Sequence, residues 1–155
     1  TVPGDVYDYY PLEDGRIAFT LGDVSGKGMN AALLMAKTAS LLRCLGKSIK
    51  EPGRLLTLVN DEICETATRG MFVTLVHGIY DPACGYVRLA NAGHEPPLIL
   101  SREGEFSSIQ AEAPPLGIAP SLIDEDGFPE TEFNLDGGKL FVFTEGITEG
   151  YIAEG

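Results

Sequence analysis

The sequence has no tryptophan, and its 11 lysine and arginine residues are outnumbered by 23 aspartate and glutamate residues. The resulting net charge of −12 repels phosphate backbones and anionic membrane surfaces, and no run of basic residues offsets it locally. This composition argues against a nucleic-acid partner. An anionic phospho-substrate would need a cation to approach such a surface.

Cysteine is also scarce. Cys44, Cys64 and Cys84 are an odd number without a CxxC pair, which argues against a disulfide framework or a zinc knot. We expect free thiols, buried or half-buried, in a reducing compartment. No apolar run reaches the roughly 18 to 20 residues of a membrane span, and no segment resembles a signal peptide. The sequence therefore predicts a cytoplasmic protein.

The length of 155 residues and the hydrophobic share of 44% suit one domain with a single large core. We expect residues 1–155 to form one domain. No terminal element is predicted at residues 151–155. The abrupt start and end of the chain lead us to expect a fragment of a longer multidomain regulator.

Two strand-like runs, 6–12 and 16–21, flank a turn in which Asp14-Gly15 is a strong hairpin signal. A loop centred on Asp14 places Asp5 directly opposite Asp23, and a two-residue loop shifts the match by one place. Opposed residues have Cα atoms roughly 4.5 to 5.5 Å apart, and like charges so placed destabilise a sheet. The hairpin therefore predicts a cation between two carboxylates.

Apolar residues at helical spacing predict a largely buried helix after residue 28, with Asn30 as its N-cap and Gly46 as its stop. A second helix is expected to begin near Pro52. Its polar face is interpreted as solvated and carries Asn60, Asp61, Glu62 and Glu65.

Strands are predicted at 71–80, 86–92, 98–100 and 106–109, and residues 111–128 are interpreted as a loop. A last hairpin is expected to join 131–135 to 139–144 through the turn at Asp136. This order of elements favours an α+β sandwich in which helices cover antiparallel sheets over a parallel βαβ fold.

The stretch GDVSGKG at 22–28 joins the second strand to the first helix. It fails as a nucleotide-binding P-loop, because only three residues separate Gly22 from Gly26 and Gly28 replaces the required serine or threonine. The stretch suits a hard cation such as Mg²⁺, with oxygen ligands from the Asp23 side chain and the Val24 carbonyl. A glycine turn whose aspartate only satisfies backbone donors is the alternative.

Five motifs occur in series along the chain. They are GDVYDY at 4–9, GDVSGKG with MNAALLM at 22–35, NAGHEPPL at 91–98, PLGI at 115–118 and TEGITE at 144–149. In order and spacing they resemble the PPM-type (type 2C-like) metal-dependent serine/threonine protein phosphatases, in their bacterial SpoIIE/RsbU-like branch. The resemblance covers essentially the whole chain.

The resemblance implies a four-layer α/β/β/α sandwich with two Mg²⁺ or Mn²⁺ ions at one end of the sheets. Asp23 would bridge both ions, Val24 would bind one through its carbonyl, and Asp5 would act on water held there. Glu145 stands where the family usually has the aspartate of a TDG motif, as a ligand of the second ion. The segment for a further aspartate lies beyond residue 155, so we expect a C-terminally truncated domain with at most one well-occupied ion.

By this resemblance the chain hydrolyses phosphoserine or phosphothreonine on a partner protein. That partner would be of the anti-sigma-factor antagonist type, with a sensory or receiver domain fused outside this fragment. Uncatalysed hydrolysis of phosphate monoesters is among the slowest reactions, and metal ions can accelerate it by activating water and neutralising the phosphoryl charge. The sequence has neither a GxSxG elbow nor a plausible Cys-His pair for covalent catalysis. The alternative is a catalytically impaired module that only docks the partner. His77 and His94 are interpreted as structural, although the turn at Gly93 could bring His94 near the active end.

Overall fold

The hairpin at the start of the chain forms with the predicted pairing. In a computed structural model, which describes residues 5–26, 28–66, 70–120, 127–143 and 151–154, strand β1 (Asp5–Pro11) runs antiparallel to β2 (Ile17–Val24). The Leu12 amide donates to the Arg16 carbonyl at 2.7 Å, so the loop has three residues and is centred on Asp14. Asp5 is consequently the Cα partner of Asp23, and the prediction is confirmed.

Nine strands in the described part of the chain form two antiparallel sheets. The first sheet has the order β1-β2-β3-β4-β7, with β3 at Val73–Asp81, β4 at Tyr86–Ala92 and β7 at Thr131–Asn134. The second has the order β6-β5-β8-β9, with β5 at Leu98–Leu100, β6 at Phe106–Ser108, β8 at Lys139–Phe141 and β9 at Tyr151–Glu154. The strand β3 is central, as its apolar residues on both faces predict.

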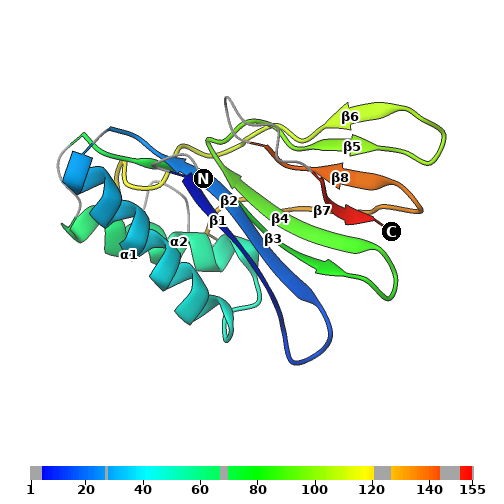
Figure 1. Cartoon of the computed structure of the whole chain (residues 1–155), viewed down its shortest axis with the longest axis horizontal. Coiled ribbons are helices and arrows are strands. Elements are labelled where there is room, and N and C mark those ends of the chain that lie inside the picture. The colour runs from blue at the N-terminus through cyan, green and yellow to red at the C-terminus, as the bar shows by residue number, and fades with distance from the viewer. Residues whose placement is uncertain (1–4, 27, 67–69, 121–126, 144–150, 155) are drawn as a thin grey trace.

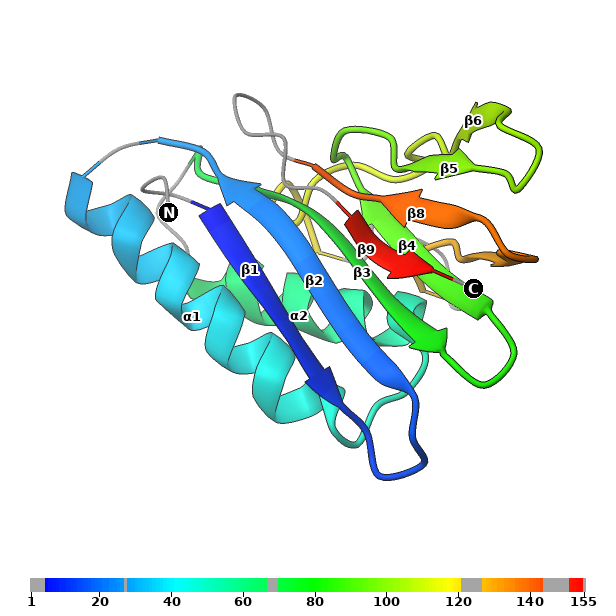
Figure 2. The ribbon, with the colours of Figure 1, turned by 45° about the vertical axis from the view of Figure 1, so that its right-hand side comes forward.

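The first sheet is covered on both faces except at its edge strand β1, where Tyr7 and Tyr9 are 54% and 61% exposed. Helices α1 (Gly28–Gly46) and α2 (Pro52–Thr66) cover one face, and the second sheet lies on the other (Figures 1 and 2). Alternation along β3 separates the two cores, because Leu75 packs toward the helices and Val76 toward the second sheet. The predicted α+β class with antiparallel sheets and flanking helices is confirmed. Both helices of the described residues cover the first sheet, so the second helical layer has no counterpart among them.

The helix α1 is less buried than predicted. It begins at Gly28, two residues before the expected Asn30 cap, and it buries a single stripe made of Ala31, Leu34, Thr38, Leu42 and Gly46. The side chains of Met29 and Leu33 are 73% and 60% exposed, because the sheet and α2 contact only one side of the helix. Neither helix of the described ranges has the length and apolar character that crossing a membrane requires.

The last predicted hairpin is wrong. The strand β7 pairs with β4 in the first sheet, whereas β8 pairs with β5 and β9 in the second. The turn at Asp136, whose φ of 49° is left-handed, therefore carries the chain from one sheet to the other. The strand β9 was not expected from the sequence, and its backbone completes the edge beside β8.

The cysteines are also more exposed than predicted. Cys44 and Cys84 lie on the surface and Cys64 is half-buried; all three are free thiols. The exposed pair sits on the outer side of α1 and in the β3–β4 turn, where no second layer covers the chain.

Candidate active site

Asp23 lies at the end of β2 and points toward the second sheet. It shares a face with Phe19 and Leu21, which are buried in the core between the sheets. Unlike those two residues, Asp23 is half-exposed, because β2 ends there and the chain turns toward α1. A carboxylate at the accessible end of an otherwise apolar face can bind a cation from solvent.

The backbone on either side of Asp23 is held against β3. Gly22 has no room for a side chain, since a Cβ there would lie 2.3 Å from the Thr74 carbonyl oxygen and 2.6 Å from Leu75 Cδ1. Ser25 and Phe72 form a reciprocal pair, in which the Ser25 amide donates to the Phe72 carbonyl at 2.9 Å and Ser25 Oγ accepts from the Phe72 amide at 2.8 Å. These contacts fix the segment that carries Asp23 and the Val24 carbonyl.

The turn into α1 uses glycine at left-handed positions. Gly26 and Gly28 have φ values of +89° and +82°, which residues other than glycine rarely adopt. The chain therefore leaves β2 after Val24 and begins α1 at Gly28. The predicted glycine-dependent corner is present, and Lys27 lies outside the described residues.

The structure describes only part of the predicted ligand set. The backbone of Asp5 is paired with Asp23 in the β1–β2 ladder. Glu145 lies outside the described residues. Within the part that is described, no three His, Cys, Asp or Glu side chains form a metal-binding group. Of the predicted centre, the described backbone therefore gives the Cα register of Asp5 with Asp23 and the position of Val24 in β2.

His94 lies near this corner and joins the two sheets. Its Nδ1 is 3.2 Å from Thr74 Oγ1, and Thr74 is the Cα partner of Asp23. Its Nε2 is 2.9 Å from the carbonyl oxygen of Phe143, which follows β8. From the sequence, only the turn at Gly93 suggested that His94 could lie near the active end. No sequence pattern indicated that its imidazole would contact Thr74 and the Phe143 carbonyl.

The comparison with known proteins decides the family. The sequence model of the family described as Stage II sporulation protein E (SpoIIE) matches residues 13–155. The chain belongs to the SpoIIE family. This SpoIIE-family chain is 30% identical over 177 residues to "Protein IcfG" of Synechocystis sp., with 96% of this chain and 27% of IcfG covered. It is 28% identical over 148 residues to "Phosphoserine phosphatase RsbU" of Bacillus subtilis, with 94% of this chain and 43% of RsbU covered.

Solved structures agree on the fold. The RsbU and RsbW domains of Rv1364c from Mycobacterium tuberculosis match with a TM-score of 0.77 at 26% identity, over 94% of this chain and 40% of that one. RsbX, crystallised in complex with magnesium, matches with a TM-score of 0.75 at 14% identity, over 94% of this chain and 68% of that one. The SpoIIE-family chain spans roughly a quarter of IcfG and less than half of RsbU.

The PLGI motif of this SpoIIE-family chain contacts β3 on the edge opposite to β2, next to the corner that carries Asp23. Leu116 and Val73 exchange backbone hydrogen bonds of 2.9 and 2.8 Å, and Val73 pairs on its other edge with Val24. Asn60 of α2 accepts from the Gly117 amide at 2.8 Å and donates to the Ala119 carbonyl at 3.1 Å. The prediction that Asn60 is solvated is therefore wrong: it is only 3% exposed, because the 115–119 loop closes over α2.

His77 has a structural position, as predicted. It is fully buried on β3, and its Nδ1 lies 2.7 Å from Thr20 Oγ1 on the neighbouring strand β2. Burial lowers the pKa of His77 from 6.5 to about 4, because the apolar core penalises the charged imidazolium. His77 is therefore a neutral histidine whose hydrogen bond lies within the first sheet, where it stabilises the fold and is not part of the candidate site.

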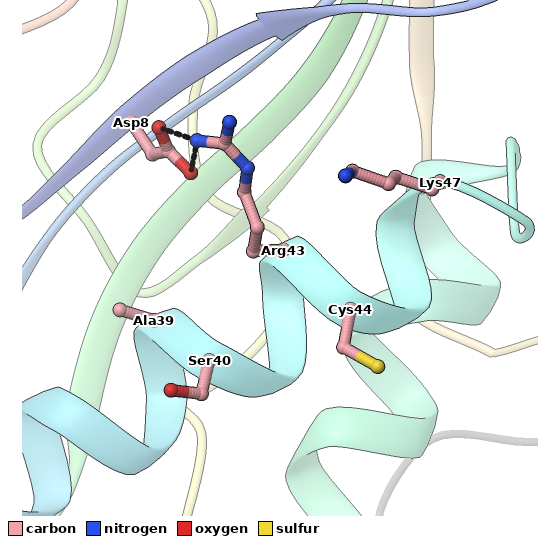
Figure 3. A pocket seen from close by; sticks show the side chains of 6 residues that line it. All are labelled: Asp8, Ala39, Ser40, Arg43, Cys44 and Lys47. Carbon is pink, nitrogen blue, oxygen red and sulfur yellow. Dashed lines mark hydrogen bonds and ion pairs between the residues drawn. The ribbon is translucent and has the colours of Figure 1, made fainter.

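A pocket of about 480 Å³ lies elsewhere, between β1 and the second half of α1 (Figure 3). Arg43 spans it and donates to both carboxylate oxygens of Asp8 at 2.8 and 3.0 Å. The Arg43 guanidinium also lies 4.9 Å from the centre of the Tyr10 ring. The remaining residues that line the pocket come from α1, including Cys44, and from Lys47 directly after the helix. The Asp8–Arg43 pair ties the helix to the edge strand, and none of the predicted metal ligands lines this pocket.

Proposed function

We propose that this chain hydrolyses phosphoserine or phosphothreonine on a partner protein with the help of Mg²⁺ or Mn²⁺. The observation that carries the proposal is the pairing of Asp5 with Asp23 at the strand-to-helix corner. Family membership supports it, since the relative RsbU is named a phosphoserine phosphatase. The net charge of −12 makes a cation necessary for a phosphorylated substrate to approach.

The residues at the corner fit a divalent cation. Two opposed aspartates destabilise a strand pair unless positive charge compensates them, and carboxylate and carbonyl oxygens are the ligands that hard cations prefer. We assign Asp5, Asp23 and the Val24 carbonyl to this site, with Glu145 as a further ligand. Because Glu145 is longer than the family's aspartate, we expect one ion to be well occupied and the second to be weak.

When bound, the cation would supply a Lewis acid that favours deprotonated water and neutralises charge on the phosphoryl group. Asp23 would orient the ion, and Asp5 would accept a proton from the attacking water. In the reaction a bond forms between the water oxygen and phosphorus while the bond from phosphorus to the seryl or threonyl oxygen breaks. The leaving oxygen takes up a proton, and inorganic phosphate is released.

The proposed substrate is a small regulatory domain of the anti-sigma-factor antagonist type. The chain spans only part of IcfG and RsbU, which supports the view that residues 1–155 are one domain of a longer regulator with a fused sensory or receiver domain. The replacement of aspartate by Glu145 favours one alternative function. In it, the domain docks the phosphorylated partner without turning it over.

The test is turnover by the full protein that contains this chain. A phosphoserine peptide and p-nitrophenyl phosphate would be assayed across a range of Mn²⁺ and Mg²⁺ concentrations, and released phosphate would be measured. We expect Asp23→Asn to lower kcat by at least a hundredfold. Glu103→Gln, an exposed acid in the β5–β6 turn, is the matched control and should retain wild-type turnover.

Two outcomes separate the proposals. Metal-dependent turnover that disappears in Asp23→Asn supports the phosphatase. Wild-type protein that releases no phosphate at any metal concentration, yet binds a phosphorylated regulatory domain, would favour the docking module.

A further inference from the structure

The imidazole of the buried residue His94 is held at both of its ring nitrogens. The residue is 5% exposed; its Nδ1 lies within hydrogen-bond distance of Thr74 Oγ1, and its Nε2 lies within hydrogen-bond distance of the Phe143 carbonyl oxygen. A carbonyl oxygen only accepts, so Nε2 of the neutral ring carries the proton and Nδ1 accepts from the Thr74 hydroxyl. Both ring nitrogens are therefore used, and the ring has one defined orientation.

The backbone of His94 is held as firmly as its ring. The His94 amide donates to Asn91 Oδ1 at 2.8 Å, and Asn91 Nδ2 donates to the His94 carbonyl at 3.2 Å. Gly93 has a φ of +70°, and a Cβ at Gly93 would lie 2.7 Å from the Pro115 side chain. The NAGH sequence thus forms a rigid turn that presents the imidazole in a fixed position.

One partner of His94 lies in the first sheet, and the other lies just after a strand of the second sheet. Thr74 is on β3 and pairs with Asp23, whereas Phe143 follows β8 of the second sheet. His77 makes a comparable contact to Thr20, but both of those residues lie in the first sheet. His94 is therefore a polar bridge across the space between the sheets, at the end where Asp23 is half-exposed.

We propose that His94 is a positioning residue of the active site, which sets the separation of the two sheets beside Asp23. This inference rests on the proposed function. Asp23 belongs to the first sheet, while the segment after Phe143 leads in sequence to Glu145, two residues further on. Through Thr74 the bridge holds the β2–β3 pair that carries Asp23, and through Phe143 it holds the chain directly after β8. In this role His94 acts through the backbone segments that it connects.

The experiment uses isosteric amides that keep one half of the bridge at a time. In His94→Gln the amide nitrogen replaces Nε2 and retains the donor to the Phe143 carbonyl. In His94→Asn the amide oxygen replaces Nδ1 and can accept from the Thr74 hydroxyl, but the donor to Phe143 is lost. His94→Phe removes both, and His77→Asn is the control for loss of a buried imidazole. Mn²⁺ binding to the full protein would be measured without substrate, from the electron paramagnetic resonance signal of free Mn²⁺.

We expect Mn²⁺ affinity to fall at least tenfold in His94→Asn and further in His94→Phe. His94→Gln should recover affinity to within about threefold of wild type, and His77→Asn should bind normally. Amide hydrogen exchange on the metal-free protein supplies an independent readout. Exchange should accelerate at residues 22–25 and 140–143 together in His94→Asn and His94→Phe, and less in His94→Gln.

The outcomes distinguish the two proposals. If wild type binds Mn²⁺ no better than Asp23→Asn, the proposed metal site is wrong, and the exchange data alone then decide whether His94 couples the sheets. If wild type binds Mn²⁺ but all His94 variants bind equally well while melting at lower temperature, the positioning role is overturned. Unchanged exchange in both segments of His94→Phe would overturn it as well.

Discussion

Asp5 and Asp23 face each other across the β1–β2 ladder, at the point where β2 ends and the chain turns toward α1. Three further contacts hold the same end of the sheet. Val24 pairs with Val73, Ser25 pairs reciprocally with Phe72, and Val73 bonds to Leu116 on its other edge. The backbone that carries Asp23 is therefore fixed on both sides, and such rigid support is what the proposed metal site would need.

The first prediction concerns Asp5. In metal-free protein, Asp5→Asn should leave stability unchanged or raise it by up to about 1 kcal/mol, because it removes one of two opposed charges. Mn²⁺ at a hundredfold excess over its Kd should stabilise wild type by about 2.7 kcal/mol and the variant by much less. Urea unfolding with and without Mn²⁺ measures both effects. Glu13→Gln in the hairpin loop is the control, and equal stabilisation of Asp5→Asn and wild type would refute the shared site.

The second prediction concerns the close approach of β2 and β3 at Gly22. Gly22→Ala should destabilise the fold by about 1 to 3 kcal/mol, since the added methyl group meets the Thr74 carbonyl oxygen at 2.3 Å. Thermal and urea unfolding provide the measurement. Gly15→Asn is a suitable control, because nothing lies within 4 Å of a Cβ there and asparagine tolerates the φ of +89°. A Gly22→Ala variant as stable as wild type would contradict the packing described above.

The third prediction is a pH dependence that originates at His77. The folded-state pKa of about 4 lies below the unfolded value of 6.5, so only the unfolded state takes up a proton between those values. The stabilisation is complete above pH 6.5 and is lost as the pH falls toward 4. We expect wild type to lose about 2 kcal/mol from this group between pH 7 and pH 5.

Urea unfolding at both pH values, on wild type and His77→Asn, isolates that contribution. Asparagine keeps a polar group near Thr20 but does not titrate, so the variant should show the smaller fall in stability between pH 7 and pH 5. Identical pH dependence in the two proteins would mean that His77 is not held neutral in the fold.

The fourth prediction concerns Asn60, which joins α2 to the PLGI loop. Asn60→Ala leaves the Gly117 amide without its acceptor and should destabilise the protein by about 1 to 3 kcal/mol. Glu65→Ala on the exposed side of α2 should change stability by less than about 0.5 kcal/mol. Hydrogen exchange at Gly117 gives a second measurement, since the loss of its acceptor should accelerate that amide. Equal stability of the two variants would show that the Asn60 contacts are not formed.

Short-range patterns in the sequence were sufficient to predict the β1–β2 hairpin and its register. The Asp14-Gly15 signal set the loop, and the loop set the register that brings Asp5 opposite Asp23, because pairing in a two-stranded hairpin propagates residue by residue from its turn. The start of α2 at Pro52 and the strands β3 and β4 followed from similarly local patterns. The family motifs then supplied the expected roles of Asp23, Val24 and Glu145.

The remaining features depended on neighbours that are distant in sequence. An Asp-Gly turn at 136–137 has the same local chemistry whether its strands pair or diverge into two sheets, so the crossing from β7 to β8 was decided by the strands already in place. The burial of Asn60 and the exposure of Leu33 depended on which side of each helix met another layer. The sequence alone determined the hairpin that makes Asp5 and Asp23 Cα partners, because turn and register are local. Only the packing of one sheet on the other decided that His94 would connect Thr74 to Phe143, since that contact requires both sheets to be assembled.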